Sequence, residues 1–286
     1  MDIAVRLLNG LLMIALPIAL GVYLARRTGQ RWRLFLVGAV LFIGSQVLHI
    51  PFNSVVLNPI LEQLGFGDGI FGSGLVIGAL LLGLSAGLFE ELTRWVGLRF
   101  WIKEARSWSS ALMYGAGWGG AEAILLGLLV LWVLVQALLF QEGSLQSLIP
   151  PEQLALVEAQ FAAYWDTPLY LNLLGAVERA FALVLQISLS VMVMRSFTHN
   201  NRIWLVAAIT WHTLVDAVAV VAITQIGAVA TEAIVAVMAL ISLVIILRLK
   251  EEEPPQEERA GAPPAEFEPA PVRATEEKLD DSRYSK

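Results

Sequence analysis

Long apolar runs alternate with short polar segments along most of the chain. A helix needs about 20 mostly apolar residues to cross the hydrocarbon layer of a membrane. Seven runs reach roughly this length, at Leu7–Leu24, Leu34–Ile50, Ser73–Val96, Ser109–Phe140, Leu169–Met194, Ile203–Thr224 and Ala228–Leu247. We therefore predict an all-α polytopic membrane protein with about seven transmembrane helices.

Basic residues occur on alternate connections between these runs. The second, fourth and sixth connections, residues 51–72, 141–168 and 225–227, contain no lysine or arginine. The other connections and the end of the last run carry Arg26, Arg27, Arg31, Arg33, Arg99, Lys103, Arg106, Arg195, Arg202, Arg248 and Lys250. Because cytoplasmic loops are enriched in these residues, we expect the N-terminus outside and the C-terminus inside. Arg6 is the exception to this pattern.

Two further segments do not look like spans. Pro150–Ala163 begins with two prolines and has apolar residues at helical spacing, which predicts an amphipathic helix on the outer face. Residues 251–286 are rich in Glu, Pro and Ala and contain few apolar residues, which predicts a disordered cytoplasmic tail. The chain would then divide into a transmembrane helical domain, residues 1–250, and a tail, residues 251–286.

Composition agrees with membrane insertion. Hydrophobic residues make up 57% of the chain and charged residues 15%, whereas soluble domains carry about 25% charged residues. The chain has no cysteine, which excludes disulfides, thiolate metal sites and a cysteine nucleophile. The net charge of -6 comes largely from the tail. We therefore expect membrane lipids as partners, and no nucleic acid.

Ionisable residues nonetheless occur inside the apolar runs. Each costs at least about 2.5–3.5 kcal/mol near the bilayer centre, so such residues are rare and usually functional. The candidates for a functional site are Glu90, Glu91, Arg94, Glu122, Glu178, Arg179, His212 and Asp216.

The first cluster, Glu90-Glu91-x-x-Arg94, lies in the third run. On a helix Arg94 can pair with either glutamate. The two acids point about 100° apart, so one is left free to face a cavity and act as a general base. The alternative is an ion pair at the membrane edge, where Arg94 and the acids reach water. The sequence leaves both interpretations open.

Glu122 follows a glycine-rich stretch in the fourth run. Gly115 and Gly119 form a GxxxG pair, which allows another helix to approach closely and place Glu122 against it. Glu178 and Arg179 are adjacent and point apart, so we expect each to contact other helices in a supporting role. Arg179 is then a counter-charge for Glu122 or Asp216.

His212 and Asp216 are four residues apart in the sixth run and share one helix face. This spacing predicts that Asp216 orients the His212 ring. His49 with Asn53, at the end of the second run, is a weaker candidate of the same kind.

Four segments together resemble a known family. FEELTRW, YGAGWGGAEAILLG, ERAFALVLQISLSVMVM and WHTLVDA are similar, in this order, to motifs of the YhfC family of intramembrane proteases. That family lies within a larger group that contains the type II CAAX prenyl endopeptidases and the PrsW proteases. The resemblance extends from about His49 to Asp216.

The resemblance implies a hydrolase of the bacterial plasma membrane that cleaves transmembrane or lipid-modified proteins. Glutamates and histidines would activate water, with Glu90, Glu91 and Arg94 in the first motif. Glu122, Glu178 and Arg179 would belong to the second and third motifs. His212 and Asp216 would stabilise an oxyanion or hold a metal. Zinc is the implied cofactor, with His212 and Glu122 as its candidate ligands.

This chain also departs from the pattern of the resemblance. Trp118 and Gln186 stand where relatives have histidines, and the first motif is EExxR rather than the EExxxR of the prenyl endopeptidases. Because these histidines are missing, a protein without zinc is the alternative expectation. Three functions stay open: an active protease, a non-catalytic pseudoprotease that binds a membrane partner, and a proton-coupled transporter.

Overall fold

The computed structural model describes residues 2–66 and 73–251, and these contain helices but no strand. The long helices are α1 (Asp2–Thr28), α2 (Trp32–Phe52), α4 (Ser73–Val96), α5 (Trp108–Gln141), α8 (Leu174–Thr198), α9 (Ile203–Ile226) and α10 (Ala228–Arg248). Shorter elements are the π-helices η1 (Asn53–Leu57) and η2 (Gly97–Trp101), the 3-10 turn η3 (Gln146–Leu148), and α3 (Asn58–Gln63), α6 (Pro151–Asp166) and α7 (Leu169–Asn172).

Seven helical segments of the described residues are long and apolar enough to span a membrane. The predicted all-α polytopic fold with seven spans is therefore confirmed. One boundary is wrong: the second span was expected to end at Ile50, but helical structure continues through η1 and α3 to Gln63. Pro51 lacks an N–H and breaks the usual hydrogen-bond pattern. The wider π-helical turn that follows keeps the segment helical.

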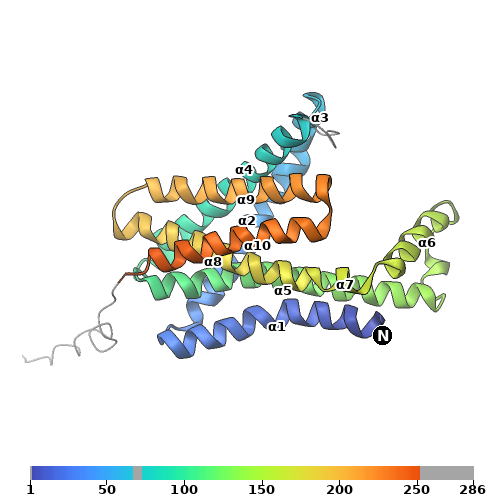
Figure 1. Cartoon of the computed structure of the whole chain (residues 1–286), viewed down its shortest axis with the longest axis horizontal. Coiled ribbons are helices and arrows are strands. Elements are labelled where there is room, and N and C mark those ends of the chain that lie inside the picture. The colour runs from blue at the N-terminus through green and yellow to red at the C-terminus, as the bar shows by residue number, and fades with distance from the viewer. Residues whose placement is uncertain (1, 67–72, 252–286) are drawn as a thin grey trace, which may run out of the picture. The chain divides into compact units, whose positions relative to one another are not determined.

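The helix α5 lies at the centre of the packing and contacts α1, α2 and α8 (Figure 1). The α9 helix packs along α4, and α10 packs against α8 and α9. Glycines permit the closest approaches: a Cβ on Gly117 would lie 1.9 Å from the backbone oxygen of Phe35 in α2. On the other side of α5, a Cβ on Gly115 would lie 2.7 Å from the Cα of Ile187 in α8. The predicted GxxxG contact is thus made with α8, which brings Glu122 and Gln186 together.

Arg6 has a structural explanation for breaking the charge pattern. It is only 2% exposed and donates hydrogen bonds to the Tyr164 carbonyl at 2.6 Å and to Asn172 Oδ1 at 2.8 Å. Its guanidinium also lies 4.0 Å from the centre of the Tyr164 ring. Arg6 therefore ties the start of α1 to the end of α6 and to α7. The orientation of the termini stays a prediction.

Of the two predicted non-spanning segments, only Pro150–Ala163 lies wholly within the described residues. The predicted helix Pro150–Ala163 forms as α6, Pro151–Asp166, and none of its residues is buried. Its place on the outer membrane face stays a prediction. The predicted tail, apart from Glu251, lies outside the described residues.

Candidate functional site

A cavity of about 140 Å³ lies among the spanning helices. Residues of α4, α5, α8, α9 and α10 line it. The ionisable lining residues are Glu90, Glu122, Glu178, Arg179, His212 and Asp216, six of the eight predicted site residues. The other two, Glu91 and Arg94, do not line the cavity but contact residues that do.

Glu91 and Arg94 form a fully buried ion pair. Arg94 Nη1 donates to Glu91 Oε2 at 2.6 Å, and the exposed fraction of both side chains is 0%. This finding excludes the alternative in which the pair reaches water at the membrane edge. Arg94 Nη2 also donates to Gln186 Oε1 at 2.5 Å, and its guanidinium lies 4.3 Å from the centre of the Trp118 ring. The cation is therefore held by α4, α5 and α8 together.

Glu90 is the acid that Arg94 leaves to the cavity. Its Oε1 accepts a hydrogen bond from Gln46 Nε2 at 3.0 Å. Its Oε2 accepts from Trp118 Nε1 at 2.9 Å and from Gln186 Nε2 at 3.3 Å. A carboxylate has about four acceptor positions, so three are used and one is left. Glu90 thus faces the cavity held by neutral donors.

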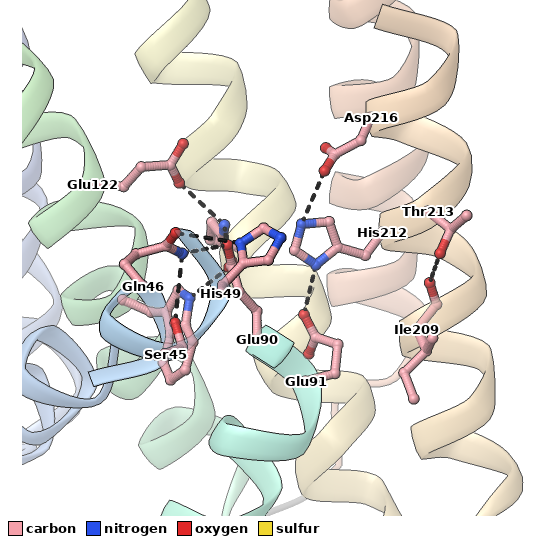
Figure 2. Close-up of polar contacts among 12 residues, drawn as sticks. Ser45, Gln46, His49, Glu90, Glu91, Glu122, Ile209, His212, Thr213 and Asp216 are labelled. Carbon is pink, nitrogen blue, oxygen red and sulfur yellow. Dashed lines mark hydrogen bonds and ion pairs between the residues drawn. The ribbon is translucent and has the colours of Figure 1, made fainter. Parts of the chain in front are cut away.

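Both nitrogens of the His212 ring face a carboxylate (Figure 2). Nδ1 lies 2.9 Å from Glu91 Oε1, whereas Nε2 lies 3.5 Å from Asp216 Oδ2. The contact with Asp216 is the one that the i, i+4 spacing predicts, and the shorter contact with Glu91 adds a second acid that the sequence did not indicate. The Asp216 side chain is 36% exposed and lies on the cavity wall. The sequence could not show this because Glu91 and His212 lie on different helices.

Arg179 links two further acids that line the cavity, Glu122 and Glu178. Its Nη1 pairs with Glu122 Oε1 and its Nη2 with Glu178 Oε1. The predicted counter-charge for Glu122 is therefore present. The expectation that Glu178 and Arg179 would not contact each other is wrong, because the long arginine side chain reaches back to its neighbour. Gln186 Nε2 donates a hydrogen bond to the other carboxylate oxygen of Glu122, Oε2, at 3.1 Å.

The side chains do not fit a zinc ion. Zinc sites in enzymes use three protein ligands with free lone pairs, and no three His, Asp or Glu residues of residues 2–66 and 73–251 are grouped in this way. Of the two predicted ligands, Glu122 accepts N–H donors on both oxygens. His212 Nε2 could act as one ligand, since Glu91 holds the opposite ring nitrogen as it does in many metal sites, but no second and third ligand stand beside it among the described residues. The family's implied metal therefore has no matching donor set among the described side chains.

Sequence reasoning missed one supporting residue, Gln46, and misjudged two others, Trp118 and Gln186. Gln46 and the indole N–H of Trp118 bind Glu90, and Gln186 bridges Glu90, Glu122 and Arg94. Trp118 and Gln186 were seen only as replacements for histidine. The i, i+3 spacing of Gln46 and His49 in an apolar run was the signal available for Gln46.

Comparison with known proteins agrees with this arrangement of motifs. A family model described as YhfC intramembrane metalloprotease matches residues 12–239. The chain is 31% identical over 260 residues to the uncharacterized membrane protein YhfC of Bacillus subtilis (strain 168), covering 85% of this chain and 94% of the relative. No solved structure matches the chain. The seven spans and the bacterial relative support an integral protein of a bacterial membrane. The chain belongs to the YhfC intramembrane metalloprotease family.

Proposed function

We propose that this protein is an intramembrane hydrolase that cleaves a peptide bond of a transmembrane or lipid-modified protein in the described cavity. The observation that carries the proposal is the buried series Arg94–Glu91–His212, which ends at a cavity between spanning helices. A base oriented by a buried acid is the arrangement that proton transfer at a peptide bond requires.

In the proposed reaction a water oxygen attacks the peptide carbonyl carbon and passes a proton to His212 Nε2. The C–N bond then breaks, and the same proton moves to the leaving nitrogen, which gives a carboxylic acid and an amine. Glu91 would hold the Nδ1–H of the ring, and Asp216, 3.5 Å from Nε2, would stabilise the imidazolium as it forms. This assignment moves the role of base from Glu90 or Glu91 to His212.

Two other cavity residues would complete the site. Glu90 has one acceptor position left after its three N–H donors, and would use it to hold the attacking water. Arg179 lines the cavity and would stabilise negative charge on the carbonyl oxygen. No step requires zinc, which the donor set does not fit.

One observation favours a second candidate, the non-catalytic binding of a transmembrane partner. Both oxygens of Glu90 and both oxygens of Glu122 already accept N–H donors. Acids with this many N–H donors hold neighbouring helices together. The same donors disfavour protonation of the carboxylate, which a general base would need to undergo. In this case the cavity would accept a side chain of a partner without cleaving it.

New protein termini in membranes would separate the two candidates. The protein is expressed in a bacterial host, and peptide termini inside transmembrane segments are identified by mass spectrometry. We expect new termini with the wild type, and a loss of about 10²–10⁴-fold in their rate of formation for His212→Ala, the range for a lost general base. Glu91→Gln should lower the rate as well.

Matched controls are available outside the cavity. His199→Ala removes an exposed histidine between α8 and α9, and Glu158→Gln changes an exposed acid of α6. Both should retain the wild-type set of termini. Identical termini in wild type and His212→Ala would reject hydrolysis. Recovery of one co-purifying membrane protein by both forms would then favour the binding function.

A further inference from the structure

A second polar series reaches Glu90 from the side of α2. Ser85 Oγ lies 2.7 Å from Asn53 Oδ1, and Asn53 Nδ2 lies 2.9 Å from His49 Nε2. His49 Nδ1 lies 3.4 Å from Gln46 Oε1, and Gln46 Nε2 lies 3.0 Å from Glu90 Oε1. Gln46, His49 and Glu90 lie side by side in Figure 2. Ser85 and His49 are buried. The proposed reaction makes no use of this series.

The acceptor role of Glu90 determines the direction of every hydrogen bond in the series. Trp118 and Gln186 also donate N–H groups to Glu90, which therefore acts as an acceptor, and Gln46 presents its NH₂ group to Glu90 and its oxygen to His49. His49 Nδ1 must then carry the proton and donate to Gln46. Its Nε2 has a free lone pair and accepts from Asn53.

The last step of the series follows from the same reasoning. With its NH₂ group directed to His49, Asn53 presents its oxygen to Ser85, whose hydroxyl can donate. Reversing the series would turn the Gln46 oxygen toward the Glu90 oxygen, and two acceptors 3.0 Å apart repel each other. The five groups are therefore mutually consistent in one direction only.

Local backbone structure supports this placement. The π-helical turn η1 begins at Asn53, two residues after Pro51, and the Asn58 N–H bonds to the Asn53 carbonyl. π-turns within helices occur frequently at functional sites. The Phe89 ring stacks on the His49 ring, with centres 5.3 Å apart and planes at 27°. The ring plane of His49 is thus set by packing as well as by its two hydrogen bonds.

We propose that Ser85, Asn53, His49 and Gln46 are positioning residues, which hold Glu90 in the cavity through a one-directional hydrogen-bond series and keep His49 neutral with its proton on Nδ1. Neutral histidine in water favours a proton on Nε2, so the Nδ1–H form is a distinctive consequence of the series. The role in catalysis rests on the proposed function, whereas the tautomer does not.

Nitrogen-15 NMR of the whole protein, labelled at histidine and held in lipid bilayers, tests the proposal. The chain has three histidines, so His199→Ala and His49→Gln assign the signals. In the wild type at neutral pH, His49 should show a protonated Nδ1 and an unprotonated Nε2. A wild-type His49 with its proton on Nε2, or with both nitrogens protonated, would overturn the proposal.

Variants test whether Glu90 sets the tautomer through Gln46. Glu90→Gln and Gln46→Leu should each abolish the single Nδ1–H form, since neither leaves an acceptor-only group connected to His49. Gln136→Leu, at a position of α5 that does not line the cavity, is the matched control and should retain it. An unchanged tautomer in both Glu90→Gln and Gln46→Leu would contradict the proposed direction of the series.

Kinetics separate this proposal from the proposed function. If the protein hydrolyses peptides, Gln46→Leu should lower kcat by about 10–100-fold, as expected for a displaced catalytic group, with KM changed by less than about twofold. An equal loss in kcat and in substrate binding would reject positioning. If the wild type forms no products, the proposed function fails, and the wild-type tautomer still decides the positioning series.

Discussion

Arg94→Met is expected to destabilise the protein because it leaves a carboxylate buried without its main counter-charge. Arg94 and Glu91 are both fully buried, 2.6 Å apart. Methionine preserves much of the side-chain volume and removes the charge. It also removes the hydrogen bond to Gln186 and the stacking on Trp118.

The size of the effect follows from the burial of the pair. Removing one partner of a buried ion pair costs about 3–5 kcal/mol, because the remaining charge is left uncompensated. His212 still contacts Glu91, so we expect the lower end of this range. At about 2–4 °C per kcal/mol for a chain of this size, 3 kcal/mol corresponds to a fall of about 6–12 °C in Tm. The exposed pair Arg33–Glu104 offers a control, since such pairs contribute about 1 kcal/mol or less.

Thermal unfolding of the purified protein in detergent, followed by tryptophan fluorescence, measures this difference. The nine tryptophans provide the signal. The double variant Arg94→Met/Glu91→Leu removes both charges and should regain at least half of the lost Tm, because a buried pair replaced by apolar residues is often neutral. The reasoning is refuted if Arg94→Met shifts Tm no more than Arg33→Met does, or if the double variant is as unstable as the single one.

Three further predictions follow from other parts of the structure. Gly117→Ala should lower Tm strongly, because the added Cβ would lie 1.9 Å from the Phe35 carbonyl oxygen. Gly44→Ala is the control and should leave Tm unchanged, because its Cβ would meet nothing within 4 Å. Equal unfolding temperatures for the two variants would contradict the close contact between α2 and α5. A backbone hydrogen bond, with help from Arg33, lowers the pKa of the exposed Glu104 carboxyl. A lowered folded-state pKa gives stability that is present above the unfolded-state pKa and lost as the pH falls through the folded-state value. The small difference in Tm between wild type and Glu104→Gln should therefore be present at neutral pH and begin to fall as the pH drops below the unfolded-state pKa of about 4.3. Finally, EDTA should leave the Tm of the wild type unchanged, and added zinc should not raise it, since the described donors do not fit the ion. A rise in Tm with zinc that is lost in His212→Ala would contradict this prediction and show that the donors rearrange around the ion.

The number of spans could be predicted from the sequence because hydrophobic length alone sets it. The predicted Ser73–Val96 coincides with α4, and Ile203–Thr224 differs from α9 by two residues. The end of the second span could not be predicted in this way, because Pro51 normally marks a helix end and the π-turn that overrides it has no simple sequence signal. Periodicity and length therefore account for the fold better than for its irregular turns.

The same reasoning predicted which residues of the candidate site are involved, but not how they contact one another. The sequence indicated that one acid of the pair Glu90 and Glu91 would be free, but both are within reach of Arg94 on a helix. Which acid is free depends on contacts from three other helices: His212 binds Glu91, whereas Gln46 and Trp118 bind Glu90. These contacts join residues far apart in the chain, and spacing along one helix carries no information about them.

Trp118 and Gln186 connect the sequence departures with the chemistry of the site. If relatives carry histidines at these positions, as the resemblance implies, this chain has replaced lone-pair donors by N–H donors directed at Glu90 and Glu122. A metal ion would stabilise the negative charge of these acids by coordination. The N–H groups of Trp118 and Gln186 stabilise it by hydrogen bonding instead, so Glu90 and Glu122 are held in position without a metal. In the proposed reaction the proton transfer then falls to His212, whose Nε2 lies 3.5 Å from Asp216 Oδ2. Activity that survives removal of all metal and is lost in His212→Ala is the combination of results that this substitution of donors requires.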